Sequence, residues 1–182
     1  IEAFNKALSI KPDHAGACSN MGLVLQEQGK NEEAIEAFTK ALAIKPDHAG
    51  AHYNSSFALL NIGRIKEGLE EYEWRWKTPE FLSRQRNFSY PMWDGQTSLE
   101  DKTLLLWSEQ GIGDTLNWSS CLPLLLSRTK HVILECQEKL VPLLSRSFPN
   151  VEVKAENRNL DADRDDFDFH LPMGSLYKNL ST

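Results

Sequence analysis

The sequence predicts an α-helical repeat array followed by an α/β domain with a parallel sheet. Residues 1–17 recur as residues 35–51 with two differences, and the offset between the copies is 34 residues. Helical patterns alone continue to about residue 77, and short apolar runs alternate with helical patterns only after about residue 103. A repeat of this length is typical of stacked helix pairs, and the alternation is typical of crossover connections onto a parallel sheet.

Composition and charge narrow the function classes. The chain has 182 residues, of which 41% are hydrophobic and 25% charged, and its formal net charge is −6. No cluster of Lys and Arg suggests a nucleic-acid partner. The apolar runs are too short to cross a bilayer and no signal peptide opens the sequence, so we expect no membrane contact and a cytoplasmic location. The sequence starts inside a helical pattern and without Met, so we expect a fragment of a longer protein.

The cysteines predict neither disulfides nor a metal site. Cys18, Cys121 and Cys136 are odd in number, far apart and outside any CxxC spacing. Disulfide frameworks and zinc sites usually show even counts or paired spacings. We therefore expect free thiols in a reducing compartment.

The repeat divides the first part of the chain into a half repeat at 1–14, a full repeat at 15–48 and a degenerate repeat at 49–77. Helices are expected near 1–10, 15–28, 31–44, 49–62 and 65–77. Gly29 and Gly63 fall at turns, where a left-handed backbone costs glycine little. Pro46 ends the second helix of the full repeat, and Asn31 is expected to cap its start.

Residues 15–48 resemble a tetratricopeptide repeat (TPR). The small and large residues where its two helices cross match that family: Gly22, Ala34, Phe38 and Ala41. The next repeat departs from the pattern, because Ser56 replaces the usual Gly, and Gly68 and Arg75 replace the usual Ala. These departures indicate a terminal repeat that packs against a different kind of structure.

The resemblance implies a superhelix whose first helices line a concave surface that binds a protein or peptide. Asn20 and Asn54 occupy the same position in successive repeats, and an Asn side chain offers one acceptor and two donors to a peptide backbone. They resemble the asparagine ladder in the repeat domain of O-linked N-acetylglucosamine transferases. The expected peptide-binding residues are Asn20, Leu23, Gln26, Asn54, Phe57 and Asn61. The alternative is that each Asn bonds a neighbouring helix end.

Residues 78–102 are expected to form an irregular connector, since they contain Pro79, Pro91 and Gly95. Strands are then expected at 103–107, 131–136, 151–155 and 167–171, and helices at 115–127 and 138–148. This order predicts a partial Rossmann-like domain over 103–182, about half of a doubly wound sheet.

Gly111 and Gly113 lie between the first strand and the first helix of this domain. Free amides and the helix dipole at such a turn favour an anion, which makes the turn a candidate substrate loop. The spacing is not the full GxGxxG of dinucleotide-binding proteins, so we exclude that assignment. The alternative is a tight turn with no ligand.

The segments EYEWRWK, PMWDG and TLLLWSEQGIGDTLNWSSCLPLL resemble repeat proteins fused to a glycosyltransferase family 9 domain, which is heptosyltransferase-like and of the GT-B fold. The resemblance implies that Asp114 of the parent enzyme is the general base for an acceptor hydroxyl. It also implies that a nucleotide-sugar donor binds mainly to a second domain beyond this chain. We therefore expect no cofactor and no turnover in this chain by itself. The alternative is that Asp114 only caps the helix.

Two weaker patterns receive structural interpretations. The acidic run LDADRDDFD contains DxD spacings, but we expect a solvated loop. His14 and His48 recur at the same repeat position and are expected to be surface turn residues. Three hypotheses therefore stand: a binding module, a glycosyltransferase parent with the repeats recruiting the acceptor, and a homodimer through the apolar face of the half repeat.

Overall fold

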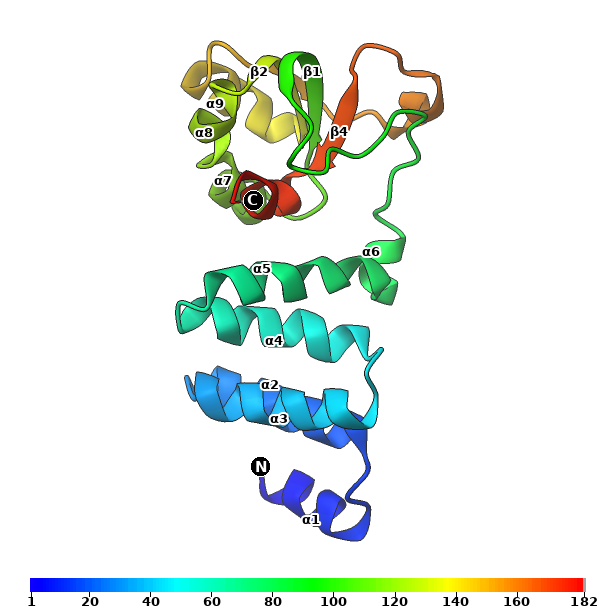
Figure 1. Cartoon of the computed structure of the whole chain (residues 1–182), viewed down its shortest axis with the longest axis vertical. Coiled ribbons are helices and arrows are strands. Elements are labelled where there is room, and N and C mark those ends of the chain that lie inside the picture. The colour runs from blue at the N-terminus through cyan, green and yellow to red at the C-terminus, as the bar shows by residue number, and fades with distance from the viewer. Residues whose placement is uncertain (182) are drawn as a thin grey trace. The chain divides into compact units, whose positions relative to one another are not determined.

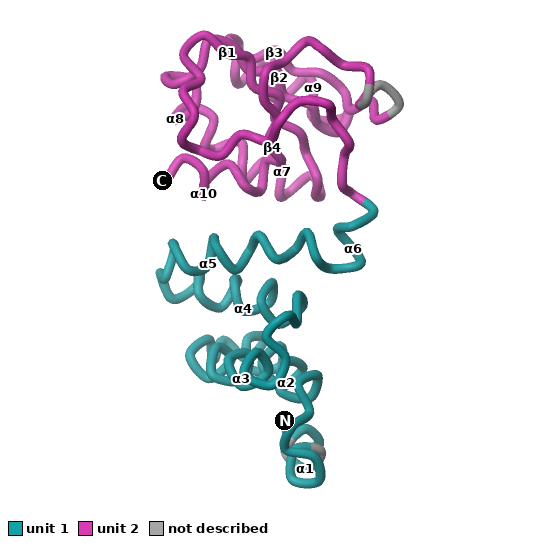
Figure 2. The backbone as a smooth tube through the Cα atoms, turned by 45° about the vertical axis from the view of Figure 1, so that its right-hand side comes forward, with its two compact units in different colours: residues 1–83 teal, residues 84–182 magenta. Residues whose placement is uncertain are grey.

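The computed structural model describes residues 1–181, with the side chains of all of these except Asn5, Ala7, Asn159, Leu160 and Ala162. The chain forms two compact units, Ile1–Ser83 and Arg84–Thr182, coloured separately in Figure 2. The first unit is a TPR-like helical region and the second is an α/β region with a four-stranded parallel sheet. The predicted fold class is therefore confirmed.

The first unit is a succession of short helices, which Figure 1 shows stacked in chain order. Their bounds are α1 (Glu2–Ile10), α2 (Ala15–Glu27), α3 (Asn31–Ile44), α4 (Ala49–Asn61), α5 (Ile65–Tyr72), the 3₁₀ helix η1 (Glu73–Lys77) and α6 (Pro79–Leu82). α2 packs on α3 and α4 packs on α5, so each repeat is a helix pair. Gly29 and Gly63 follow α2 and α4 with φ of 75° and 80°, the left-handed conformation that ends a helix.

The crossing of α2 and α3 explains the small residues of the repeat. Phe38 is fully buried, and a Cβ added to Gly22 would lie 2.7 Å from its ring. Such a distance is well inside van der Waals contact, so only glycine lets the two backbones approach around this ring. In the degenerate repeat at 49–77, the position that requires glycine is Gly68, where a Cβ would lie 2.8 Å from Leu60 Cγ.

Histidine caps the first helix of two repeats. The backbone amide of Ala17 donates to His14 Nδ1 at 3.1 Å, and that of Ala51 donates to His48 Nδ1 at 3.2 Å. Both rings therefore satisfy an amide that the helix leaves without a partner. The expected cap at Asn31 is wrong, because Asn31 is already the first residue of α3 and no side chain caps that helix.

The second unit is built on strands in the order β3-β2-β1-β4, all parallel. The strands are β1 (Leu99–Trp107), β2 (Thr129–Cys136), β3 (Glu152–Ala155) and β4 (Phe169–Pro172). The connecting helices are α7 (Ile112–Ser119), α8 (Leu122–Leu126), η2 (Glu138–Leu140), α9 (Val141–Ser147) and η3 (Arg158–Asp163), and η4 (Met173–Ser175) and α10 (Leu176–Leu180) follow the last strand. Since the chain moves from β1 to β2 and β3 and then returns to the far side of β1, the order reverses between β1 and β4.

The core of this unit explains where its elements begin and end. Leu104, Leu106, Val132 and Leu134 are fully buried on the two central strands, as continuous apolar runs of a parallel sheet should be. The expected single helix over 115–127 is two, since Pro123 opens α8 after a break at residues 120–121.

Residues ahead of β1 join this core. The backbone amide of Trp93 donates to His170 O at 2.9 Å, and its buried indole donates to Thr97 O at 2.9 Å. β1 itself begins at Leu99, which is four residues earlier than expected.

Candidate functional site

Two regions carry the candidate functional residues, one in each unit. In the first unit, the asparagine face comprises Asn20, Leu23 and Gln26 on α2 and Asn54, Phe57 and Asn61 on α4. The helices α2 and α4 are in contact, so the first helices of the two repeats are neighbours. Asn20 is exposed and Asn54 half-buried. Among the described residues, neither carboxamide has a hydrogen-bond partner, so each keeps its donors and its acceptor.

The C-terminal part of the asparagine face is engaged within the protein. Asn61 Nδ2 donates to Asn31 Oδ1 at 3.5 Å, at the outer limit of a hydrogen bond. Phe57 is 37% exposed, but its ring packs edge-on against Tyr53 at 5.0 Å and Tyr72 at 5.9 Å between centroids. Phe57 is therefore held in place by other rings and presents only its outer edge.

The third repeat also uses aromatic packing where its sequence departs from the pattern. Arg75 is fully buried, with its guanidinium 4.6 Å from the Tyr72 ring centroid and 2.7 Å from Glu73 Oε1. Trp74 stacks on His52 with ring centroids 3.7 Å apart. Arg75 stands where the family usually has Ala. Cation–π and ion-pair contacts of this large side chain thus take the place of the close helix packing that a small residue allows.

In the second unit, the candidate loop joins β1 to α7. The backbone amide of Gly111 donates to Asp114 Oδ2 at 3.2 Å, which closes the start of α7. Gly111, Gly113 and Asp114 are all exposed. A Cβ at Gly113 would meet no atom within 4 Å, whereas a Cβ at Gly111, which has an ordinary φ of −73°, would lie 3.3 Å from Asp114 Oδ2. The fold therefore leaves open space beside Gly113, while Gly111 lies close to the carboxylate.

A network of hydrogen bonds between uncharged polar groups holds the β1–α7 loop in place. Thr115 Oγ1 donates to Gly111 O at 3.0 Å and contacts Ser108 Oγ. Gln137 Nε2 donates to Gln110 O at 2.6 Å and to Ser108 Oγ at 3.1 Å. Since Ser108 and Thr115 are buried, the network fixes the loop between β1 and the end of β2.

Glu109 anchors the same loop to the segment after β4. Its carboxylate is 3% exposed and accepts from the backbone amide of Gly174 at 3.1 Å. Its backbone carbonyl accepts from Arg84 Nη1 at 3.1 Å. Ligands of doubly wound sheets bind where the strand order reverses, outside the carboxyl ends of the strands. Glu109 lies at that point, just after β1, and the exposed residues 111–114 follow it in the turn into α7 and the first turn of that helix.

A buried charge cluster lies at the carboxyl end of β2. Arg86 has a fully buried side chain and donates to Glu135 Oε2 at 2.7 Å and to Asp161 Oδ2 at 2.9 Å. Arg164 contacts the other oxygen of Glu135 and pairs with Asp166 at 2.8 Å. The acidic run was expected to be a solvated loop; for Asp161 this is wrong, because its side chain is buried against Arg86.

The cluster perturbs two neighbouring side chains. Burial, with the positive charge of Arg86, lowers the pKa of His170 to about 4, and its Nδ1 accepts from Trp107 Nε1 at 3.3 Å. Burial, with the negative charges of Glu135 and Glu156, raises the pKa of the Cys136 thiol to about 11. Cys136 is therefore a protonated core thiol with little nucleophilic character at neutral pH.

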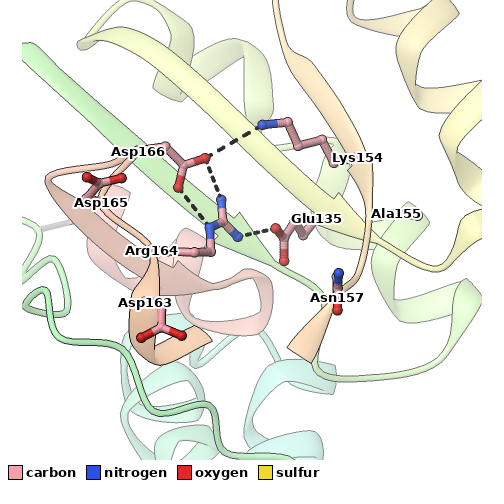
Figure 3. A pocket seen from close by; sticks show the side chains of 8 residues that line it. All are labelled: Glu135, Lys154, Ala155, Asn157, Asp163, Arg164, Asp165 and Asp166. Carbon is pink, nitrogen blue, oxygen red and sulfur yellow. Dashed lines mark hydrogen bonds and ion pairs between the residues drawn. The ribbon is translucent and has the colours of Figure 1, made fainter. Parts of the chain in front are cut away.

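A cavity of about 400 Å³ opens beside this cluster, and Figure 3 shows the side chains that surround it. Its lining is Glu135, Lys154, Ala155, Asn157, Asp163, Arg164, Asp165 and Asp166. Lys154 lies 3.6 Å from Asp166 Oδ2, and Arg164 pairs with Glu135 and Asp166, so both cations that line the cavity are already paired with carboxylates.

Within the described part of the chain, no group of three or more His, Cys, Asp or Glu could hold a metal ion. None of the helices in the described part of the chain combines the length and the apolar composition that a membrane span requires.

The sequence located the asparagine positions and the β1–α7 loop but missed Arg86, Glu109 and Glu135. The partners of Arg86 are 49 and 75 residues away, so no local pattern reveals them. The two histidine caps had a signal, since each His directly precedes an expected helix.

Comparison with known proteins supports the helical part. The tetratricopeptide repeat family model matches residues 15–48. Protein FlbA of Caulobacter vibrioides is 36% identical over 91 residues, which are 47% of this chain and 15% of FlbA. The chain thus matches only a small part of that relative's length.

Among solved structures, the crystal structure of MamA is 25% identical over 46% of this chain and 49% of its own, with a TM-score of 0.40. A mutant of the Thermobaculum terrenum O-GlcNAc transferase is 16% identical over 87% of this chain and 38% of its own, with a TM-score of 0.41. Residues 15–48 of this chain are thus a tetratricopeptide repeat, within a helical unit that is followed by a parallel α/β unit.

Proposed function

We propose that the first unit is a protein-binding module that holds an extended peptide on its asparagine face. One observation carries this proposal: Asn20 and Asn54 recur at an offset of one repeat on neighbouring helices, and no described group uses their carboxamides. A carboxamide can accept from a peptide N–H and donate to a peptide C=O at once. Repetition at a fixed spacing suits the regular backbone of an extended chain rather than one particular side chain.

The test uses random-sequence peptides displayed on phage and selected on this chain. Enriched peptides are synthesised with fluorescein, and their affinity is measured by fluorescence polarisation. Asn20→Ala with Asn54→Ala should weaken binding roughly tenfold or more, because each lost hydrogen bond is worth about 0.5–1.5 kcal/mol. Gln28→Ala, which removes an exposed carboxamide outside the face, is the matched control. If every enriched peptide binds the double variant as well as the unaltered chain, the proposal is wrong.

For the parent protein we propose a second function, sugar transfer by a glycosyltransferase family 9 domain to which the second unit contributes the acceptor side. The resemblance of residues 71–77, 91–95 and 103–125 to that family motivates this proposal. It is favoured by the exposed position of Asp114 in the first turn of α7, at the carboxyl edge of a parallel sheet. An exposed carboxylate there can take the proton of an acceptor hydroxyl, and Gly113 leaves space for that acceptor. A nucleotide-sugar donor would be held mainly by residues outside this chain.

Asp114→Asn separates catalysis from helix capping. Asp114 is the third residue of α7 and accepts from the amide of Gly111, the N-cap residue; the amide oxygen of Asn can accept the same hydrogen, so the contact survives while the base is lost. In the full-length parent, nucleotide release from a panel of nucleotide sugars should fall by about 10²–10⁴-fold. The thermal unfolding midpoint serves as the check on folding. Unchanged nucleotide release in the variant would leave Asp114 only its capping role.

A further inference from the structure

Two grooves in the first unit are copies of each other. One lies among Ile1, which precedes α1, and the helices α2 and α3, and has a volume of about 320 Å³; the other lies among α3, α4 and α5 and has a volume of about 240 Å³. The lining of the first includes Ile1, Met21, Leu25, Lys30, Glu33 and Glu36. The lining of the second includes Ile35, Ser55, Leu59, Arg64, Glu67 and Glu70. Each residue of the second set follows its counterpart by one repeat of 34 residues.

The grooves share a pattern of apolar floor and charged rim. Leu25 and Leu59 are 7% and 4% exposed and form the floor with an isoleucine from the preceding repeat. A basic residue at the turn, Lys30 or Arg64, is followed on the second helix by two glutamates. Each rim therefore contains a cation followed by two carboxylates in the same order, to which the first groove adds Lys40 and the second adds Glu71.

The grooves lie on the other side of the first helices from the asparagine face. Successive residues of a helix are about 100° apart, so Met21 and Leu25 project about 180° from the middle of the arc formed by Asn20, Leu23 and Gln26. On α4, Ser55 and Leu59 project about 150° from the middle of the arc formed by Asn54, Phe57 and Asn61. A ligand in the grooves and a ligand on the asparagine face would not compete for the same side chains.

The rim of the second groove is net acidic, and each rim has a glutamate that can pair with a basic ligand. In the second groove Arg64 is already paired with Glu67, and Glu71 is paired with His52. Glu70 and its counterpart Glu36 are exposed and have no ion-pair partner within the described part of the chain. An incoming Lys or Arg can therefore pair with these carboxylates without first breaking an existing pair.

We propose that the two grooves form a second docking surface for a protein segment that places an apolar side chain on each leucine floor, flanked by Lys or Arg that pair with Glu36 and Glu70. Because the grooves recur at the repeat spacing, one segment with two such anchors can occupy both. The second contact is then intramolecular and raises the overall affinity beyond that of either groove. The attraction is that of exposed charges, so binding weakens as salt is added.

The test uses peptides from the same phage selection, bound to a variant that carries Glu36→Lys and Glu70→Lys. Both positions are exposed on helices and Lys has a helix propensity similar to that of Glu, so the fold should persist, as far-ultraviolet circular dichroism can check. We expect a class of enriched peptides rich in Lys or Arg around apolar residues. These should bind the variant about tenfold more weakly, since pairs are lost and repulsions introduced.

Two controls separate this surface from general charge and from the asparagine face. Glu32→Lys with Asp47→Lys makes the same change in net charge at exposed positions outside the grooves and should leave the affinity of that class unchanged. Asn20→Ala with Asn54→Ala should also leave it unchanged. The proposal is overturned if no enriched peptide loses affinity in the groove variant, or if the Glu32 and Asp47 variant weakens binding equally. Loss in the asparagine variant alone would support only the asparagine face.

Discussion

His48 closes the first turn of α4 through its Nδ1 atom, which accepts the amide hydrogen of Ala51. We predict that His48→Ala lowers the free energy of unfolding by about 0.5–2 kcal/mol, because that amide then has no partner in the helix. His48→Asn should retain most of the stability, since Asn is among the preferred caps. Urea denaturation followed by far-ultraviolet circular dichroism measures both. Equal losses in the two variants would show that the ring acts by packing rather than by capping.

The buried imidazole of His170 should make the second unit sensitive to mild acid. Burial and the charge of Arg86 lower its pKa to about 4, from 6.5 when unfolded. Between these values the unfolded chain binds more protons than the folded chain, so the free energy of unfolding falls as the pH drops from 6.5 toward 4. His170→Gln removes this titration. The decrease in the free energy of unfolding between pH 6.5 and 4 should therefore be smaller in the variant, by on the order of 1–3 kcal/mol.

The pH dependence is read from urea unfolding midpoints taken at several pH values. Asp166 and Asp168 also have lowered pKa values, Asp166 through Arg164 and Asp168 through the backbone amide of Thr103. Their stabilisation is lost at lower pH, below the unfolded values of carboxyl groups, so the slope just below pH 6.5 isolates the histidine. An identical slope in His170→Gln and the unaltered chain would show that this imidazole is not the sensitive group.

Among the elements of the second unit, the segment before β1 and the segment η3 are joined through Arg86. Replacing Arg86 by Met leaves Glu135 and Asp161 buried without their main cation, and breaking such a buried pair costs about 3–5 kcal/mol. Arg86→Lys should recover little, because an ammonium cannot make the bidentate contact with Asp161. The measurement is urea unfolding monitored by tryptophan fluorescence.

Arg158→Met is the control for the Arg86 variants. It removes an exposed pair with Glu156, which should be worth less than about 1 kcal/mol. Limited proteolysis adds a local readout, since the Arg86 variants should expose residues 158–166 to cleavage while the control should not. Similar behaviour of Arg86→Met and Arg158→Met would contradict the assignment of Arg86 as the tie between these two elements.

The elements differ in how far local sequence could define them. The helices of the first unit followed from the repeat, because two near-identical copies fix both period and phase. The strands followed from short apolar runs, which a parallel sheet requires on its central members. The beginning of β1 at Leu99 did not follow, because residues 99–102 mix apolar and charged side chains and pair only through contacts distant in sequence.

The candidate site likewise contains residues that the local sequence predicted and residues that it did not. Asn20 and Asn54 were predicted from their repetition, and Asp114 from the resemblance to the glycosyltransferase family. Arg86 gave no signal, since its role depends on carboxylates that only the folded sheet brings to it. A charged residue in an apparent connector reads as solvated until its partners are known.

At the scale of the whole molecule, the first helix should influence association. Ile10 on α1 is 78% exposed, whereas Ile44, its counterpart one repeat later, is 39% exposed. Covering one isoleucine side chain is worth about 1.5–3 kcal/mol at most, and a symmetric contact would cover one from each copy. We predict a concentration-dependent dimer of the chain in light scattering, with Ile10→Lys shifting it to monomer and Ile44→Lys leaving it dimeric. A monomer at every concentration, or equal effects of the two variants, would rule out α1 as the contact.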